Sequence, residues 1–153
     1  MPQIGFYHLT RTSVQEALPQ LLDRTLASGE RAVISCASDE EMKNLDRTLW
    51  ESRHYFWLPH GAEGNSDEES HAVRQPIWLS VRTEAPANGA RFLFRLNGAP
   101  TAPLAGFVRI FDLFNGQDEQ SVAEARKRWK EFRQAGYSLA YWKQEAKGWR
   151  QAG

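Results

Sequence analysis

The chain contains one cysteine, and it occupies a position where a thiol can become reactive. Cys36 lies near the end of the apolar run 31–37 and just before Ser38, where a helix is predicted to begin. A helix N-terminus lowers the pKa of a thiol and so favours a nucleophilic thiolate. No histidine with a positioned carboxylate is recognisable nearby, and cysteine also serves as a small apolar residue in buried strands. The sequence favours this second interpretation.

The histidines and the acidic runs lack the spacing of a metal site or an acid–base pair. His54, His60 and His71 could each ligate a metal, but they do not show the i, i+4 spacing of a zinc-binding helix. We expect them at the surface or in turns. The acidic runs 39–41 and 67–69 suit a helix N-terminus and a solvated loop, respectively. We therefore expect no metal, no cofactor and no catalytic site.

The C-terminal part carries an excess of positive charge within a chain of zero net charge. Residues 122–153 contain eight Lys and Arg against three Asp and Glu, a net charge of +5, whereas residues 1–121 sum to −5. Such a split predicts a surface for an acidic partner. The alternative is a solvated helix that happens to be basic.

A helix that starts near Gln117–Ser121 and stops at Gly136 would sort these cations into groups, because each residue advances by about 100°. Its apolar side chains would form one core-facing stripe, which comprises Val122, Ala125, Trp129 and Phe132. A column of cations would lie beside that stripe: Arg126, Lys130 and Arg133. The far side would hold Lys127 and Glu131 and an i, i+4 pair between Glu124 and Arg128.

A column of cations beside an aromatic side chain suits two kinds of ligand. Single-stranded nucleic acid would place phosphates on the cations and bases on the aromatic ring. An acidic peptide with an apolar residue would pair its carboxylates with the cations and seat its apolar side chain in a pocket. Three aligned cations are few for DNA, and the rest of the chain is acidic, so we favour the peptide. A third possibility is that Trp129 is a core residue and the cations only keep the helix soluble.

The elements that must position this helix alternate between strands and helices at the start of the chain. Apolar runs predict strands at 4–9, 31–37, 76–81, 91–96 and 107–114, with a short strand or extended tail at 137–143. Helices are predicted within 12–30, where Ser13 and Glu16 form a capping box and Gly29 ends the helix, and within 38–53. Pro19 should kink or reset the first of these helices.

This order predicts a three-layer α/β sandwich with a mostly parallel sheet and helices on both faces. We expect a single domain over 1–153 with an acidic surface loop at about 62–75. The turn after the first strand, "HLTRTS", has no glycine, which argues against a phosphate-binding loop. No apolar run is long enough to span a membrane and no signal peptide is visible, so we expect a soluble cytoplasmic protein.

Four segments, in order, resemble the chi subunit family of bacterial DNA polymerase III holoenzyme. They are "FYHL" at the start, residues 30–50, "FWLPHG" at 56–61 and residues 124–139. The resemblance implies a Rossmann-like fold and a non-catalytic adaptor. In that family the adaptor links the clamp-loader complex, through the psi subunit, to the acidic C-terminal tail of single-stranded DNA-binding protein, which ends in aspartates followed by Ile-Pro-Phe. Contact with DNA would then be indirect.

The resemblance also implies two sets of site residues. The tail-binding site would comprise Arg126, Trp129, Lys130 and Arg133, with Phe114 and Tyr141 as pocket walls. Trp129 stands where the family usually has tyrosine. The surface that faces psi, or another clamp-loader component, would comprise Trp50, Trp57, Pro59 and His60, with Trp57 in the place of a phenylalanine. The alternative for this second set is that the rings cap the sheet.

Overall fold

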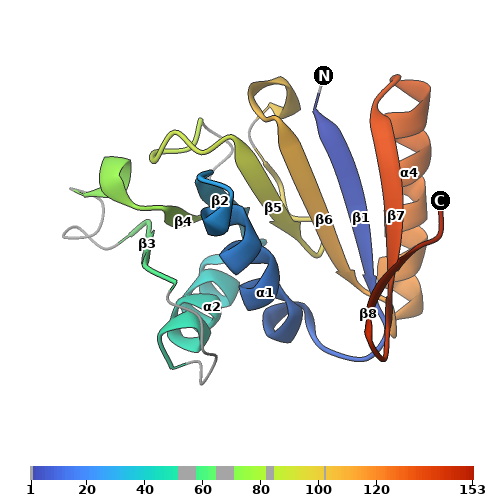
Figure 1. Cartoon of the computed structure of the whole chain (residues 1–153), viewed down its shortest axis with the longest axis horizontal. Coiled ribbons are helices and arrows are strands. Elements are labelled where there is room, and N and C mark those ends of the chain that lie inside the picture. The colour runs from blue at the N-terminus through green and yellow to red at the C-terminus, as the bar shows by residue number, and fades with distance from the viewer. Residues whose placement is uncertain (1, 52–57, 65–70, 82–84, 102) are drawn as a thin grey trace.

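A computed structural model describes residues 2–51, 58–64, 71–81, 85–101 and 103–153. Its strands form one sheet in the order β3-β4-β2-β5-β6-β1-β7-β8, and every neighbouring pair is parallel except β7 and β8 (Figure 1). The strands are β1 (Gln3–Leu9), β2 (Ala32–Ser35), β3 (His60–Ala62), β4 (Ile77–Ser80), β5 (Phe92–Leu96), β6 (Arg109–Asn115), β7 (Ser138–Glu145) and β8 (Gly148–Gln151). The helices are α1 (Val14–Ala27), α2 (Asp39–Glu51) and α4 (Glu119–Gln134), with 3-10 turns η1 (Ala72–Arg74) and η2 (Leu104–Gly106). The predicted α/β class is confirmed.

The helices lie on both faces of the sheet, as the sequence predicted (Figure 1). On one face, α1 and α2 bury side chains such as Leu22 and Leu45 against the strands. On the other face, α4 packs Ala125 and Trp129 into a second cluster that includes Phe6 of β1. Successive side chains of a strand point to opposite faces, so the same strands supply both clusters. The result is a three-layer sandwich.

The ends of the first two helices follow the predicted chemistry. The Glu16 amide donates to the Ser13 hydroxyl at the start of α1, and the Glu41 amide donates to Ser38 at the start of α2. Gly29 follows α1 with φ of 85°, a conformation that favours glycine. The helix is not reset at Pro19, because α1 continues through it from Val14 to Ala27. Pro19 is buried, as is Leu18 beside it, so tertiary packing outweighs the missing backbone donor.

A buried ion pair attaches α4 to the sheet. Arg128 donates from Nε and Nη2 to the two carboxylate oxygens of Asp112 in β6, at 2.9 and 2.8 Å. The predicted place of Arg128 on the solvent side, paired with Glu124, is therefore wrong. Glu124 instead accepts a hydrogen bond from Gln120. The helical projection could not reveal this contact, because Asp112 lies on a different element.

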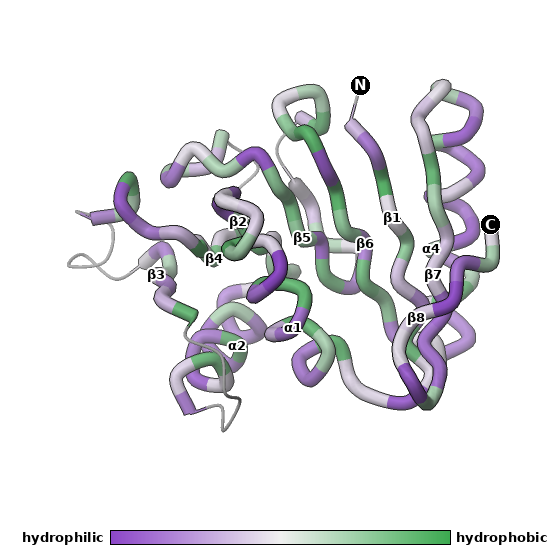
Figure 2. Tube along the Cα trace, viewed as in Figure 1, coloured by the Kyte–Doolittle hydropathy of each residue, from purple (hydrophilic) through white to green (hydrophobic). Residues whose placement is uncertain are grey.

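The chain beyond α4 forms an antiparallel hairpin of β7 and β8, and β8 was not predicted. Trp149 of β8 packs edge-on against Tyr7 of β1, with ring centroids 5.1 Å apart. Trp142 of β7 stacks on the same ring at 6.4 Å. Figure 2 shows that α4, beside this hairpin, is mainly hydrophilic along its length.

The acidic surface loop was predicted to begin at about residue 62, and this limit is too early in the sequence. Ala62 belongs to β3, and Glu63 is buried. The Glu63 carboxylate accepts hydrogen bonds from the Ser80 hydroxyl and the Val81 amide at the end of β4. Residues 65–70, which hold the acidic run, lie outside the described residues. Glu63 is thus part of the packing between β3 and β4.

Candidate functional site: a cationic pocket beside α4

A pocket of about 460 Å³ opens between α4, the end of β1 and the β7–β8 hairpin. Its walls include three rings, those of His8, Trp129 and Tyr141, and three cations, Arg126, Lys143 and Arg150. Residues 152–153 complete the rim. We call this site the cationic pocket.

The rings of the cationic pocket are fixed by contacts with the core and with one another. The Trp129 ring meets Phe6 at 5.4 Å and Tyr141 at 5.7 Å, both edge-on. His8 Nδ1 lies 2.6 Å from the Tyr141 hydroxyl oxygen, which is a hydrogen-bond distance. Trp129 is partly buried, so one side of its ring belongs to the core and another side faces the pocket. A rigid aromatic wall of this kind suits an apolar side chain of a ligand.

The electrostatics of the pocket favour an anion. None of the described side chains that line it is acidic. Burial lowers the pKa of the His8 imidazole, and the charges of Lys143 and Arg126 act in the same direction, against an opposing contribution from the Gly116 backbone. Burial raises the pKa of Tyr141, and Arg126 opposes that change. Both rings therefore experience the positive charge of Arg126.

The predicted tail-binding residues fall into three groups. Arg126, Trp129 and Tyr141 line the cationic pocket. Lys130 and Arg133 are exposed on α4 beyond the pocket wall. Phe114 is only 1% exposed and lies behind Tyr141, with ring centroids 6.3 Å apart. Phe114 therefore supports the wall from the core and does not form its surface, contrary to the expectation.

Three cationic or aromatic lining residues were not predicted: His8, Lys143 and Arg150. Lys143 follows Tyr141 by two residues in a strand, so both point to the same face, and this spacing was a usable signal. The two-residue period of a strand could not be applied to Arg150, because its strand, β8, was not predicted. His8 is the partner of Lys143 in the β1–β7 register, which only the sheet order reveals.

Cys36 and the described histidines do not form a second chemical site. Cys36 is buried, and its pKa is raised mainly by that burial and further by Glu41 and Glu63, so a thiolate is disfavoured. Among the described residues, no group of three potential metal ligands is present. His71 is exposed, as expected, and His54 lies outside the described residues. The interpretation of Cys36 as a core residue is confirmed.

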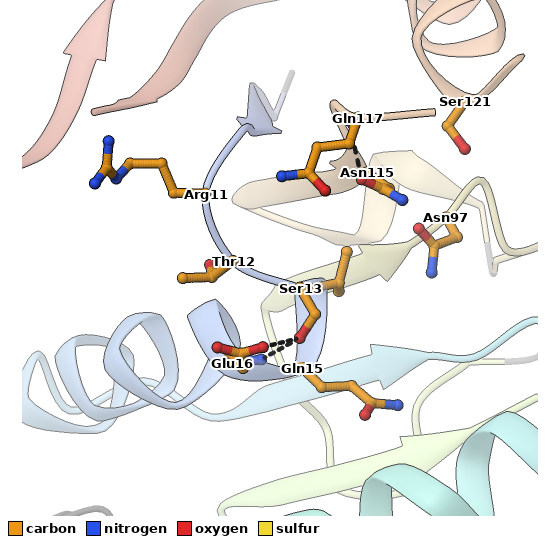
Figure 3. A pocket seen from close by; sticks show the side chains of 10 residues that line it. Arg11, Thr12, Ser13, Gln15, Glu16, Asn97, Asn115, Gln117 and Ser121 are labelled. Atoms are coloured by element: carbon orange, nitrogen blue, oxygen red, sulfur yellow. Dashed lines mark hydrogen bonds between the residues drawn. The ribbon is translucent and has the colours of Figure 1, made fainter. Parts of the chain in front are cut away.

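A second crevice, of about 630 Å³, lies where this fold class often binds ligands (Figure 3). It sits at the carboxyl ends of β1, β5 and β6, where the chain leaves adjacent strands toward opposite faces. At its two helix starts, the Ser13 hydroxyl binds the Glu16 amide and the Asp118 carboxylate binds the Ser121 amide. Arg11 and the Glu16 carboxylate carry opposite charges on its wall. The crevice therefore lacks the electrostatic bias of the cationic pocket.

Comparison with known proteins decides the family. The sequence model for "DNA polymerase III chi subunit, HolC" matches residues 1–140. The chain belongs to the DNA polymerase III chi subunit family. It is 27% identical to DNA polymerase III subunit chi of Haemophilus influenzae over 140 residues, which cover 88% of this chain and 92% of that protein. It is 24% identical to subunit chi of Escherichia coli over 134 residues, with 86% and 88% covered. For subunit chi of Pseudomonas aeruginosa the identity is 24% over 143 residues, with 91% and 94% covered.

The second surface expected of a chi family member centres on Trp50, which is 57% exposed on α2. Its ring lies 4.2 Å from that of His60. His60 is buried, with Nε2 3.0 Å from an Asp46 carboxylate oxygen and Nδ1 2.9 Å from the Leu58 carbonyl oxygen. The expectation of a surface histidine is thus wrong for His60, whose buried ring packs against the exposed ring of Trp50. Pro59 is partly exposed, and Trp57 lies outside the described residues.

Proposed function

We propose that this chi family member is a non-catalytic replisome adaptor that binds the acidic C-terminal tail of single-stranded DNA-binding protein in the cationic pocket. The observation that carries the proposal is the convergence of Arg126, Lys143 and Arg150 on a wall made by Trp129 and Tyr141. Cationic side chains pair with the carboxylates of a ligand, and aromatic walls hold an apolar side chain of the ligand. An acidic peptide that ends in an apolar residue satisfies both at once.

The same features argue against direct binding of single-stranded nucleic acid. Affinity for nucleic acid scales with the number of phosphates neutralised, and the pocket offers three cations. Residues 1–121 carry a net charge of −5 and would repel a long polyanion. A short peptide that stays within the pocket avoids this repulsion, so contact with DNA would be indirect.

The other end of the adaptor would be the surface around Trp50. An exposed tryptophan that packs against a buried, hydrogen-bonded ring is a rigid anchor of the kind that dominates interfaces. The partner would be the psi subunit or another clamp-loader component. Trp50 lies on α2 and Trp129 lies on α4, and these helices pack on opposite faces of the sheet. This separation would allow both partners to bind at the same time. The assembly would act in the bacterial cytoplasm.

The proposal is tested by titrating the protein with a fluorescent peptide that ends Asp-Asp-Ile-Pro-Phe, at low and at physiological salt. We expect saturable binding that requires the final Phe and weakens with salt, because exposed ion pairs are screened. A peptide without the Phe is the control. Failure of the wild-type protein to bind the peptide at low salt would overturn the proposal, and a length-dependent interaction with plain oligonucleotides would support the nucleic-acid alternative.

Two tryptophans provide a matched pair of variants for this assay. Trp129→Ala should weaken peptide binding by about 30-fold or more, the loss typical of a central aromatic anchor worth about 2 kcal/mol. Trp50→Ala should leave it unchanged, because Trp50 lies on α2 and does not line the pocket. Arg126→Ala should weaken binding more than Arg133→Ala, since only Arg126 lines the pocket. The reverse order would move the site along α4.

A further inference from the structure

The β7–β8 hairpin supplies two of the three cations of the cationic pocket, and most of it lies beyond the family match. The match ends at residue 140, whereas Lys143 and Arg150 come after it. The part of the pocket on α4 is therefore within the shared family region, and the opposite wall is built by a segment outside it.

The hairpin also determines how a peptide can bind at this edge of the sheet. The Tyr141 amide donates to the Gly153 carbonyl at 3.0 Å, and the Ala152 amide donates to the Tyr141 carbonyl at 2.7 Å. These bonds occupy the outer edge of β7, which would otherwise accept a peptide as an added strand. A peptide in the pocket therefore cannot pair with β7 at Tyr141, and the side chains that line the pocket are left to recognise it.

The register of the hairpin places two like charges opposite each other. Lys143 pairs with Arg150 across the β7–β8 ladder, and both side chains line the pocket. Like charges directly opposite on neighbouring strands destabilise the fold. Part of this cost is offset because Arg150 Nε forms an exposed ion pair with Glu145. The remaining unbalanced charge faces the pocket, where an anionic ligand would neutralise it.

We propose that the β7–β8 hairpin is a second cationic wall, on which Lys143 and Arg150 bind the carboxylates of the acidic stretch of the peptide, in competition with Glu145 for Arg150. This inference rests on the proposed function, since it concerns the same peptide in the same pocket. It adds that the acidic stretch lies across the hairpin, in addition to the cations of α4. It also predicts that the wall lowers the stability of the free protein while it strengthens binding.

The test compares Lys143→Ala, Arg150→Ala and the double variant with the wild type in the peptide titration. Lys147→Ala is the matched control, because Lys147 is an exposed cation in the turn of the same hairpin and does not line the pocket. Each single substitution should weaken binding at low salt by about two- to five-fold, and the double by about ten-fold, as exposed ion pairs do. Glu145→Gln should tighten binding by about two-fold, because Arg150 is released.

Two further readouts separate a binding role from a structural one. Replacing the two aspartates of the peptide by alanine should remove most of the difference between the wild type and the double variant. Lys143→Ala should leave the thermal midpoint unchanged or raise it, whereas a purely structural lysine would lower it. If the wild type binds the peptide and the double variant binds equally well, the hairpin wall is wrong and the proposed function stands. If the wild type does not bind, both are overturned.

Discussion

The ion pair between Arg128 and Asp112 gives a quantitative prediction about what holds α4, and with it the cationic pocket, on the sheet. Arg128→Ala would leave the Asp112 carboxylate, whose side chain is 1% exposed, without its two hydrogen bonds. Loss of one member of a buried pair costs about 3–5 kcal/mol, because the remaining charge stays desolvated. Arg95 lies near enough to interact electrostatically with Asp112, so we expect the lower end, about 3 kcal/mol. That is a large share of the roughly 5–15 kcal/mol that stabilise a typical domain.

Urea and thermal unfolding of the purified protein measure this effect. For a chain of 153 residues, about 3 kcal/mol corresponds to a fall in melting temperature of roughly 6–12 °C. Lys127→Ala, an exposed neighbour on the same helix, should stay within about 0.5 kcal/mol of the wild type. Replacing both Arg128 and Asp112 by leucine should cost less than Arg128→Ala alone, since no charge remains buried. A loss below about 0.5 kcal/mol for Arg128→Ala would refute the reasoning.

Three further outcomes follow from the packing around the strand ends. Gly116→Ala should lower the free energy of unfolding by about 1–3 kcal/mol, because the added Cβ would lie 2.5 Å from the Leu9 carbonyl oxygen. Gly106→Ala is the control and should be nearly neutral, because a Cβ there meets nothing within 4 Å. Equal melting temperatures for the two variants would contradict this prediction. The lowered pKa of His8 means that the unfolded chain binds its proton more readily, so stability should fall as the pH drops below about 6.5, and His8→Gln should reduce that dependence in unfolding experiments. Cys36 should react with a thiol reagent at neutral pH more slowly than a model thiol, because burial raises its pKa, and rapid labelling of the native protein would show that the strand end opens.

Local patterns were sufficient to predict most elements of the fold. The runs around β1, β2, β4, β5 and β6 are apolar and bounded by turns, and each forms a strand within a few residues of its predicted limits. Cap residues such as Ser13 fixed helix starts, because their hydrogen bonds join neighbours in sequence. The hairpin strand β8 escaped prediction because "GWRQ" is short and mostly polar, and it is stabilised by pairing with β7 and by Trp149.

The candidate site was only half predictable for a similar reason. The helical projection placed Arg126 and Trp129 together correctly, since both lie on α4. It misplaced Arg128, whose partner Asp112 comes from a strand, and it could not show that Phe114 is hidden behind Tyr141. Contacts within one helix follow from its period, whereas contacts between elements depend on sheet order and register, which a single sequence does not specify.

The position of β1 in the sheet has a consequence for how the protein folds during synthesis. Residues 3–9 are made early, yet they pair on one side with residues 109–115 and on the other with residues 138–143. Until those late residues leave the ribosome, both edges of this apolar strand remain unpaired. Forming contacts between residues so distant in sequence is slow. His8 and Tyr141, which are 133 residues apart, meet only at this final step. A nascent chain can therefore complete its cationic pocket only when the sheet has closed around its first strand, so peptide binding would report on the last event of folding.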